Sequence, residues 1–321
     1  MVERKGIAVA GTVLVDKIYG IAAYPEVGEL THIRSIDYSV GGLVSNDGID
    51  LKKLAPELNV VAICKVGDDA EGQFVIDKLR ENGVDVSAVK TAAGERTSFT
   101  EVMSVIGGQR TFFTYPGASA SFGACDIPWD SLEVKMLHLG YFLLLERVDN
   151  GDGLEILKEA KARGIMTSID LVSENSDRYS LVIPCLKYVD NLIVNETEAG
   201  KMCGIEPCEE NLERLADRLL EMGVRERVII HMPMLGVCKS RNGSFCAMPS
   251  IDVPRDFIKG KTGAGDAFCS GALLGIHNGV SDKEILEYAQ ISAMASLRTP
   301  DATSGIEELS ILRELARQYM K

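Results

Sequence analysis

The sequence predicts an α/β protein in which a mainly parallel central sheet is covered by helices on both faces, a three-layer α/β/α sandwich. Short apolar runs alternate with amphipathic stretches along the chain, a pattern typical of strand–helix–strand crossover units. Two segments interrupt this alternation with β-type patterns that no helix separates, and they predict a small antiparallel β-flap. At 321 residues and 46% hydrophobic content, the chain is long enough to bury a sizeable core.

The first predicted strand is the apolar run at 7–15. Because Arg4 and Lys5 precede it, the run also resembles a secretory signal peptide, but Asp16 and Lys17 cut it short and favour a buried strand. The later predicted strands lie at 60–67, 136–145, 164–170, 191–195, 228–232 and 245–254, and the predicted helices include 69–81, 153–162 and 267–278.

The flap is assigned to residues 29–40 and 96–115, where apolar and polar residues alternate and Gly107-Gly108 is a turn signal. A further tight hairpin is expected at 241–244, "RNGS". Because no linker or repeat divides the chain, we expect one domain over 1–321 with the flap inserted into it. An exposed flap edge also favours pairing with a second copy, as a homodimer.

Composition excludes several classes of function. The formal charge of −13 argues against nucleic acid or an anionic membrane as a partner, and no apolar stretch approaches the roughly 20 residues that span a bilayer. The eight cysteines are scattered without a CxxC pair, which is typical of reduced thiols in the cytoplasm. None of the four histidines belongs to a ligand-like pair, so the sequence shows no structural zinc motif.

The stretch "KTGAGDAF" at 261–268 is the first candidate site. Gly263, Ala264 and Gly265 precede a buried helix, so an anion can approach free backbone N–H groups at its N-terminus. Asp266 is then close enough to take a proton from an attacking hydroxyl. On local chemistry alone, Asp266 is equally well explained as an acid in the first turn of a helix. The chain has no P-loop, and "GDGLEI" at 151–156 lacks the third glycine of a dinucleotide fingerprint.

Four motifs together resemble the ribokinase-like, or phosphofructokinase-B type, carbohydrate kinases. They are, in order, "GGLVSNDGIDLKKLA" at 41–55, "VGDDAEG" at 66–72, "VNETEAG" at 194–200 and "KTGAGDAFCSGAL" at 261–273. The last is the most specific, and the likeness runs nearly from end to end of the chain.

This resemblance implies a ribokinase-like fold that binds ATP and Mg²⁺ and a flap that acts as a lid over a sugar. It implies that Gly263, Ala264 and Gly265 neutralise charge on the transferred phosphoryl group while Asp266 acts as the base. Asn195 and Glu198 match an Asn-x-x-Glu motif near the phosphates and the water shell of Mg²⁺. A helix cap at Asn195 with acids in the first turn is as good a local explanation.

On the sugar side, the resemblance places Asp16 at a strand end where its carboxylate accepts bonds from substrate hydroxyls. Gly41, Gly42 and Asn46 match the backbone and the amide that complete such a site. The simpler interpretations are a strand-end turn for Asp16 and a helix cap for Asn46.

Three departures from the family pattern affect the nucleotide side and the sugar side. Gly260 replaces a carboxylate that helps many relatives hold a monovalent cation, which argues against potassium activation, and Lys261 brings a positive charge beside the anion site. The usual Thr-x-Gly-x-x-Gly loop is "HMPMLG" at 231–236, which keeps only Gly236 and contains a proline that fixes the backbone. Ser119 stands where many members have asparagine, and Asp47 adds a charge next to the sugar-side motif.

The sequence therefore predicts an ATP-dependent kinase that phosphorylates a primary hydroxyl of a small sugar or sugar derivative. Two alternatives stay open. A nucleoside kinase of the same family needs a slot for a base, for which Tyr38, Phe113 and Tyr115 are candidates. A non-catalytic sugar or nucleotide sensor is favoured by the departures but opposed by the retained Asp266.

Overall fold

A large mixed sheet forms the centre of the computed structural model, which describes residues 4–105 and 108–320. Within these residues its order is β14-β13-β12-β11-β10-β9-β1-β4, parallel from β4 to β12 and antiparallel at β13 and β14. The strands are β1 (Ile7–Ala10), β4 (Val60–Ile63), β9 (Met136–Phe142), β10 (Met166–Leu171), β11 (Asn191–Asn195), β12 (Arg227–Met232), β13 (Leu235–Ser240) and β14 (Phe245–Pro249).

Two apolar cores lie on opposite faces of this sheet. Along β1, Ile7 and Val9 belong to one core and Ala8 and Ala10 to the other, because successive strand residues point to opposite faces. The first core includes side chains of α1 (Leu43–Leu54), α2 (Ala70–Glu81), α7 (Ala264–Asn278), α8 (Asp282–Ser296) and α9 (Leu309–Arg317). The second includes side chains of α4 (Gly153–Ala162), α5 (Glu196–Cys203) and α6 (Leu212–Glu221). The predicted sandwich with helices on both faces is confirmed.

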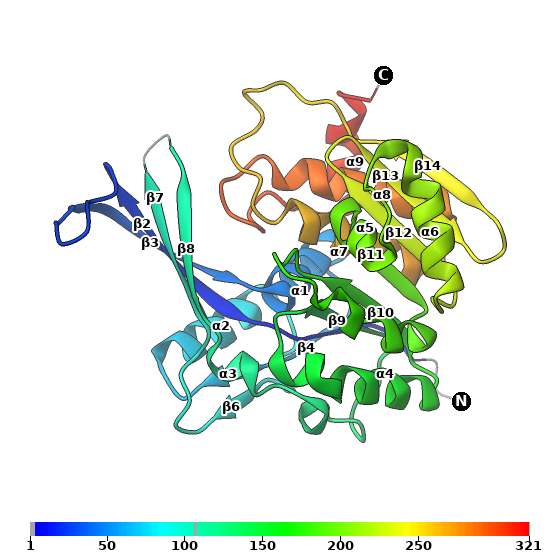
Figure 1. Cartoon of the computed structure of the whole chain (residues 1–321), viewed down its shortest axis with the longest axis horizontal. Helices are drawn as coiled ribbons and strands as arrows, with labels where there is room; N and C mark the ends of the chain where they lie inside the picture. The colour runs from blue at the N-terminus through cyan, green and yellow to red at the C-terminus, as the bar shows by residue number, and fades with distance from the viewer. Residues whose placement is uncertain (1–3, 106–107, 321) are drawn as a thin grey trace.

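The flap is a separate sheet with the strand order β3-β2-β7-β8, and Figure 1 shows it projecting from the main body. Its strands are β2 (Leu14–Ile21), β3 (Ile33–Gly41), β7 (Phe99–Val105) and β8 (Arg110–Tyr115). β2 was not among the segments assigned to the flap, and it pairs in parallel with β7, whereas the other two pairings are antiparallel. Gly107 of the expected turn lies outside the described residues.

The apolar run at 7–15, expected as one strand, is divided between the two sheets. Gly11 separates β1 from β2 with a φ of 135°, and a side chain there would bring its Cβ within 2.7 Å of the Gly140 carbonyl oxygen. Apolar character alone did not show this break, because both strands are buried near it.

The single strand predicted at 60–67 is wrong, because its first half is β4 of the main sheet and its second half belongs to a separate small sheet. Most other predicted boundaries agree within a few residues. A small sheet pairs β5 (Lys65–Gly67) with β6 (Lys90–Ala92), and α3 (Gly117–Ala120) is a single turn. The hairpin at 241–244 joins β13 to β14 as expected, and α7 begins at Ala264 rather than at Ala267. Among the described residues, no helix is both long and apolar enough to cross a bilayer.

Candidate active site

Asp266 lies in the first turn of α7, where groups from two other elements hold its carboxylate. The Asn46 amide of α1 donates a hydrogen bond of 2.7 Å to Oδ2, and the Tyr141 hydroxyl donates one of 3.0 Å to Oδ1. Burial raises the pKa of Asp266, and the bonds from Asn46 and Tyr141 lower it. A carboxylate anchored in this way has a fixed position, unlike a solvated acid of a first helical turn.

The start of α7 requires small residues. Gly263 is the N-cap with a φ of 76°, and a Cβ there would lie 2.4 Å from the Ala302 Cβ, so a larger residue is excluded on both backbone and steric grounds. Gly265 is exposed, and the nearest neighbour of a Cβ added to it would be His231, at 3.5 Å. No side chain covers Gly265 at the N-terminus of α7, and the role of this end as an anion site stays a prediction.

Tyr141 is a site residue that the sequence analysis missed. It lies near the end of β9 with a φ of 58°, an uncommon conformation for a residue other than glycine. In this position its backbone N–H donates to Asp170 at 2.7 Å while its hydroxyl reaches Asp266. The sequence did contain a signal for it, because Tyr141 carries a hydroxyl and follows a buried apolar run. In α/β proteins, ligands bind at the carboxyl ends of such parallel strands.

The four predicted sugar-side residues lie where the flap strands β2 and β3 meet the start of α1. Asp16 on β2 faces Gly41, where an added Cβ would be 2.4 Å from the Asp16 Oδ2, and Gly42 caps α1 with a φ of 80°. Asn46 lies one turn into α1 and is buried. Burial raises the pKa of Asp16 to about 6. The Asn46 N–H donates to the Gly42 carbonyl at 3.0 Å and its amide donates to Asp266, while the role of these residues toward a sugar stays a prediction.

Asn195 and Glu198 form a reciprocal capping box at the start of α5. The Asn195 side chain accepts a bond of 2.9 Å from the Glu198 N–H, and the Glu198 carboxylate accepts one of 3.0 Å from the Asn195 N–H. The Ser173 hydroxyl donates to Glu198 at 2.9 Å. Burial raises the pKa of Glu198 to about 7. The helix-cap interpretation is confirmed, while the role toward phosphates and Mg²⁺ stays a prediction.

A cavity of about 170 Å³ brings three carboxylates together at the carboxyl ends of the strands. Asp266, Glu198 and Asp170 all line it, and Asp170 is a second residue that the sequence analysis missed. Its signal was an acid at the end of the predicted strand 164–170. Burial raises the pKa of Asp170 well above its usual range, and the Asp266 and Glu198 charges raise it further. Carboxylates facing a small cavity are the donors that Mg²⁺ prefers, so these residues fit that ion.

A larger cavity of about 550 Å³ adjoins the smaller one. It is mostly apolar, and Asn195, His231 and Gly265 line both cavities. Lys261 lines it as an exposed cation, while Phe268 stacks on His231 with a ring-centroid distance of 4.9 Å. Gly236, predicted to bind the cofactor, does not line this cavity. It lies behind Phe268, whose ring would be 3.1 Å from a Cβ added at that glycine. An apolar slot beside a helix N-terminus and a lysine has the character of a nucleotide site.

One departure from the family pattern, Gly260, has a local explanation. A Cβ at Gly260 would lie 2.7 Å from the Thr299 carbonyl oxygen, so this backbone leaves no room for a carboxylate. Pro233 lines the larger cavity at the turn between β12 and β13.

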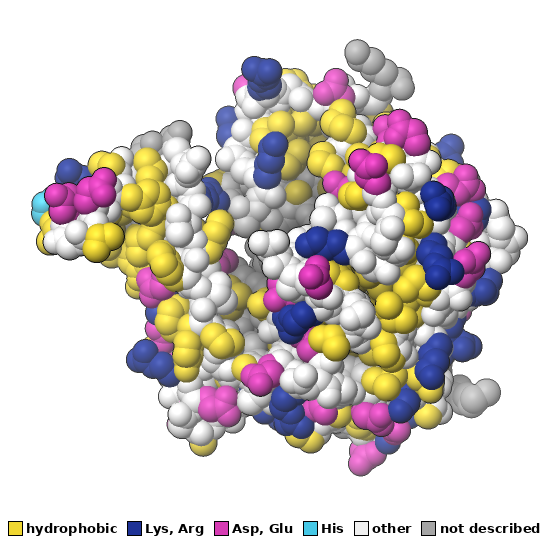
Figure 2. Space-filling view, in the orientation of Figure 1, with side chains coloured by type: hydrophobic (Ala, Val, Ile, Leu, Met, Phe, Trp, Pro, Cys, Tyr) yellow, Lys and Arg dark blue, Asp and Glu magenta, His cyan; other side chains and the backbone are white. Residues whose placement is uncertain are grey.

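The flap contacts the body beside the candidate anion site, where Arg110 donates a bond of 3.3 Å to the Thr262 hydroxyl. Figure 2 shows the surface hollowed between the flap and the body, with hydrophobic side chains over the flap.

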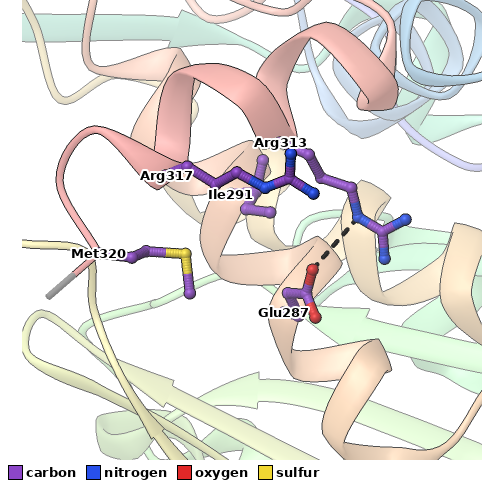
Figure 3. A pocket seen from close by; sticks show the side chains of 5 residues that line it. All are labelled: Glu287, Ile291, Arg313, Arg317 and Met320. Atoms are coloured by element: carbon purple, nitrogen blue, oxygen red, sulfur yellow. Dashed lines mark hydrogen bonds and ion pairs between the residues drawn. The ribbon is translucent and has the colours of Figure 1, made fainter.

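A third hollow of about 450 Å³ lies away from these residues, at the C-terminal helix. Figure 3 shows Arg313 paired with Glu287 at 3.2 Å, with Ile291, Arg317 and Met320 around them. None of the predicted site residues lines it. The two adjoining cavities at the start of α7 therefore form the candidate active site.

Comparison with known proteins gives a consistent result over almost the whole chain. The family model described as pfkB family carbohydrate kinase matches residues 6–309. A ribokinase of Arabidopsis thaliana is 24% identical over 316 residues, covering 96% of this chain and 80% of the relative. A 5-dehydro-2-deoxygluconokinase of Clostridium perfringens is 22% identical and covers 90% of this chain and 87% of its own.

Solved structures share the fold. The Arabidopsis thaliana ribokinase complexed with ribose and ATP matches with a TM-score of 0.86 at 20% identity, covering 98% of this chain and 99% of that one. A nucleoside kinase of Methanocaldococcus jannaschii matches with a TM-score of 0.80 at 17% identity, covering 98% of each chain. The ribokinase-like sandwich predicted from the sequence is confirmed.

Proposed function

The chain belongs to the pfkB family of carbohydrate kinases and is a phosphotransferase with an alcohol group as acceptor, and we propose that it transfers the γ-phosphoryl group of ATP to a primary hydroxyl of a small sugar or sugar derivative. The observation that carries this proposal is the position of Asp266. Asn46, from the predicted sugar-side motif, donates a hydrogen bond to its carboxylate, and Asp266 itself lines the smaller of the two cavities at the start of α7.

In the proposed reaction Asp266 takes the proton of the attacking hydroxyl. Its raised pKa suits this role, because a base works best when its pKa approaches the operating pH. Gly263, Ala264 and Gly265 present the N-terminus of α7 to the charge on the phosphoryl group. Catalysis then rests on positioning and electrostatic stabilisation, as in other phosphoryl transfers.

On the donor side, the larger cavity would take the base and ribose of ATP, with Asn195 and Lys261 toward the phosphates. Mg²⁺ would be held through water by Glu198, with Asp170 and Asp266 facing the same cavity. That ion would supply positive charge to the β- and γ-phosphates. We assign no direct nucleotide contact to Gly236, which supports Phe268 from behind.

On the acceptor side, Asp16, Gly41, Gly42 and Asn46 would bind the sugar hydroxyls under the flap. An ionised Asp16 accepts strong hydrogen bonds from hydroxyls, and close packing at Gly41 keeps its carboxylate in place. The eight free thiols support the proposal that the enzyme works in the cytoplasm.

A nucleoside kinase is the second candidate, favoured by the aromatic side chains on the flap. Tyr38, Phe113 and Tyr115 are 57%, 58% and 42% exposed, and such rings can stack on a base. A sensor without catalysis is the third candidate, and the anchored Asp266 argues against it.

The test is a thermal-shift screen of sugars, ribose among them, and of nucleosides, each with and without ATP and Mg²⁺. A specific ligand raises the midpoint by mass action, so the compound class is identified before any product assay. Each stabilising compound is then tested for ATP-dependent phosphorylation. A sugar that both stabilises and is phosphorylated supports the proposal; stabilisation and turnover with nucleosides alone support the second candidate, and binding without turnover supports the sensor.

A further inference from the structure

Three side chains beneath Asp266 form a buried cluster that the proposed reaction does not use. Asp47 comes from α1, His138 from β9 and Cys269 from α7, and one ligand atom from each lies within 4.8 Å of the others. All three residues are fully or almost fully buried. They are far apart in the sequence, so no motif revealed them.

The spacing within the cluster agrees with a tetrahedral metal centre. The His138 Nε2 lies 3.6 Å from the Cys269 Sγ and 3.5 Å from the Asp47 Oδ2. Zinc bond lengths of about 2.0–2.3 Å to nitrogen, oxygen and sulfur imply edges of about 3.3–3.6 Å between ligands at tetrahedral angles. The other ring nitrogen, Nδ1, pairs with the Ser168 hydroxyl at 3.1 Å, which orients the ring with Nε2 toward the cluster.

Asp47 is a buried carboxylate whose neighbours are the other two members of the cluster. Its exposed fraction is 0%, and the polar side chains that approach it are those of Cys269 and His138. Burying a carboxylate is costly, and a cation bound between these three side chains would offset that cost.

We propose that Asp47, His138 and Cys269 form a binding site for a divalent cation of borderline softness, of which Zn²⁺ is the representative. Imidazole, thiolate and carboxylate together are the donor set of zinc rather than of magnesium or calcium, whose ligands are oxygens. Cys269 also lines the 170 Å³ cavity, which supplies an entry path and room for a water as the fourth ligand. The alternative is a metal-free network in which Asp47 is protonated.

An ion at this site would fasten together the three elements that hold Asp266. Asp47 follows Asn46 in α1, Cys269 lies one turn after Asp266 in α7, and His138 precedes Tyr141 in β9. The ion is therefore structural in this proposal. It is independent of the nucleotide-bound Mg²⁺ and of the identity of the acceptor.

The experiment measures metal binding to the full chain, without a kinase assay. Chelator-treated protein is titrated with Zn²⁺, the bound metal is counted by mass spectrometry, and thermal unfolding is followed. Co²⁺ is then used in place of Zn²⁺, because a cobalt–thiolate bond gives a charge-transfer absorption that reports a cysteine ligand. We expect about one ion per chain, a higher unfolding midpoint and the thiolate absorption.

The variants Cys269→Ala and His138→Gln test the ligands, and Cys64→Ala is the matched control because Cys64 is equally buried but outside the cluster. We expect the first two to weaken Zn²⁺ binding at least about 100-fold and the control to bind as the wild type does. Unchanged binding in Cys269→Ala overturns the proposal. Absence of the thiolate absorption in wild-type protein also overturns it, even where the variants fail to fold.

Discussion

Replacing Asp266 with asparagine tests the proposed mechanism most directly. The substitution keeps the shape of the side chain but removes the proton acceptor. Loss of a general base slows turnover by about 10²–10⁴-fold, which corresponds to about 3–5 kcal/mol in the activation barrier. We expect a decrease of this size in kcat.

The structure also predicts what Asp266→Asn leaves intact. A hydrogen bond to a charged group is worth about 1.5–3 kcal/mol, so the weakened contacts with Asn46 and Tyr141 cost stability. Removing one buried charge from among the Asp47, Asp50 and Asp170 carboxylates acts in the opposite direction. Because the two effects oppose each other, we expect the free energy of unfolding to change by less than about 2 kcal/mol.

The assay compares kcat, the sugar Kd and the unfolding midpoint in Asp266→Asn and in a matched control, Asp282→Asn. Asp282 is also an acid in the first turn of a helix, but it accepts bonds from Arg227 at 2.9 Å and Ser240 at 2.6 Å, away from both cavities. We expect the control to lose stability and keep its kcat. A kcat for Asp266→Asn within about threefold of the wild type would refute the assignment of the base.

Four further predictions concern sugar binding, stability, the monovalent cation and the flap. Sugar binding without nucleotide should weaken about tenfold at about pH 5. Burial raises the Asp16 pKa to about 6, so at that pH the carboxylate is mostly protonated and no longer accepts hydrogen bonds as an anion. Calorimetry should show no such pH dependence in Asp16→Asn. Because of the same pKa shift, the folded chain holds the Asp16 proton more tightly than the unfolded chain does. The Asp16 contribution to the free energy of unfolding therefore decreases as the pH rises from about 4 to about 6. Denaturant unfolding of the wild type and of Asp16→Asn measures this change. Turnover should be nearly equal in sodium, potassium or a bulky organic cation, because Gly260 leaves no room for a cation-holding carboxylate. Lys261→Ala should lower kcat about tenfold, because it removes a positive charge beside the phosphates. Strong potassium activation together with an unaffected Lys261→Ala variant would contradict this. Sedimentation should report a homodimer, because the flap exposes a sheet edge and the apolar side chains Ile33, Ile36, Tyr38, Phe112, Phe113 and Tyr115; a monomer at every concentration would leave the flap as a lid only.

Local chemistry made parts of the site predictable from the sequence. The glycines before Asp266 and the Asn195–Glu198 pair act through backbone groups a few residues away, so their pattern is visible within one short stretch. Strands and helices followed in the same way from the periodicity of apolar residues, because burial on one or both faces repeats along each element.

Tertiary packing decided the features that depend on distance across the fold. The division of 7–15 at Gly11 depends on the close approach of Gly140, which is remote in the sequence. Tyr141 and Asp170 joined the site because neighbouring parallel strands end at the same edge of the sheet. Similarly, the grouping of Asp47, His138 and Cys269 arises where α1, β9 and α7 meet. Sequence patterns record the environment of each element, but which side chains meet depends on packing between elements that are distant in the chain, and no short motif encodes it.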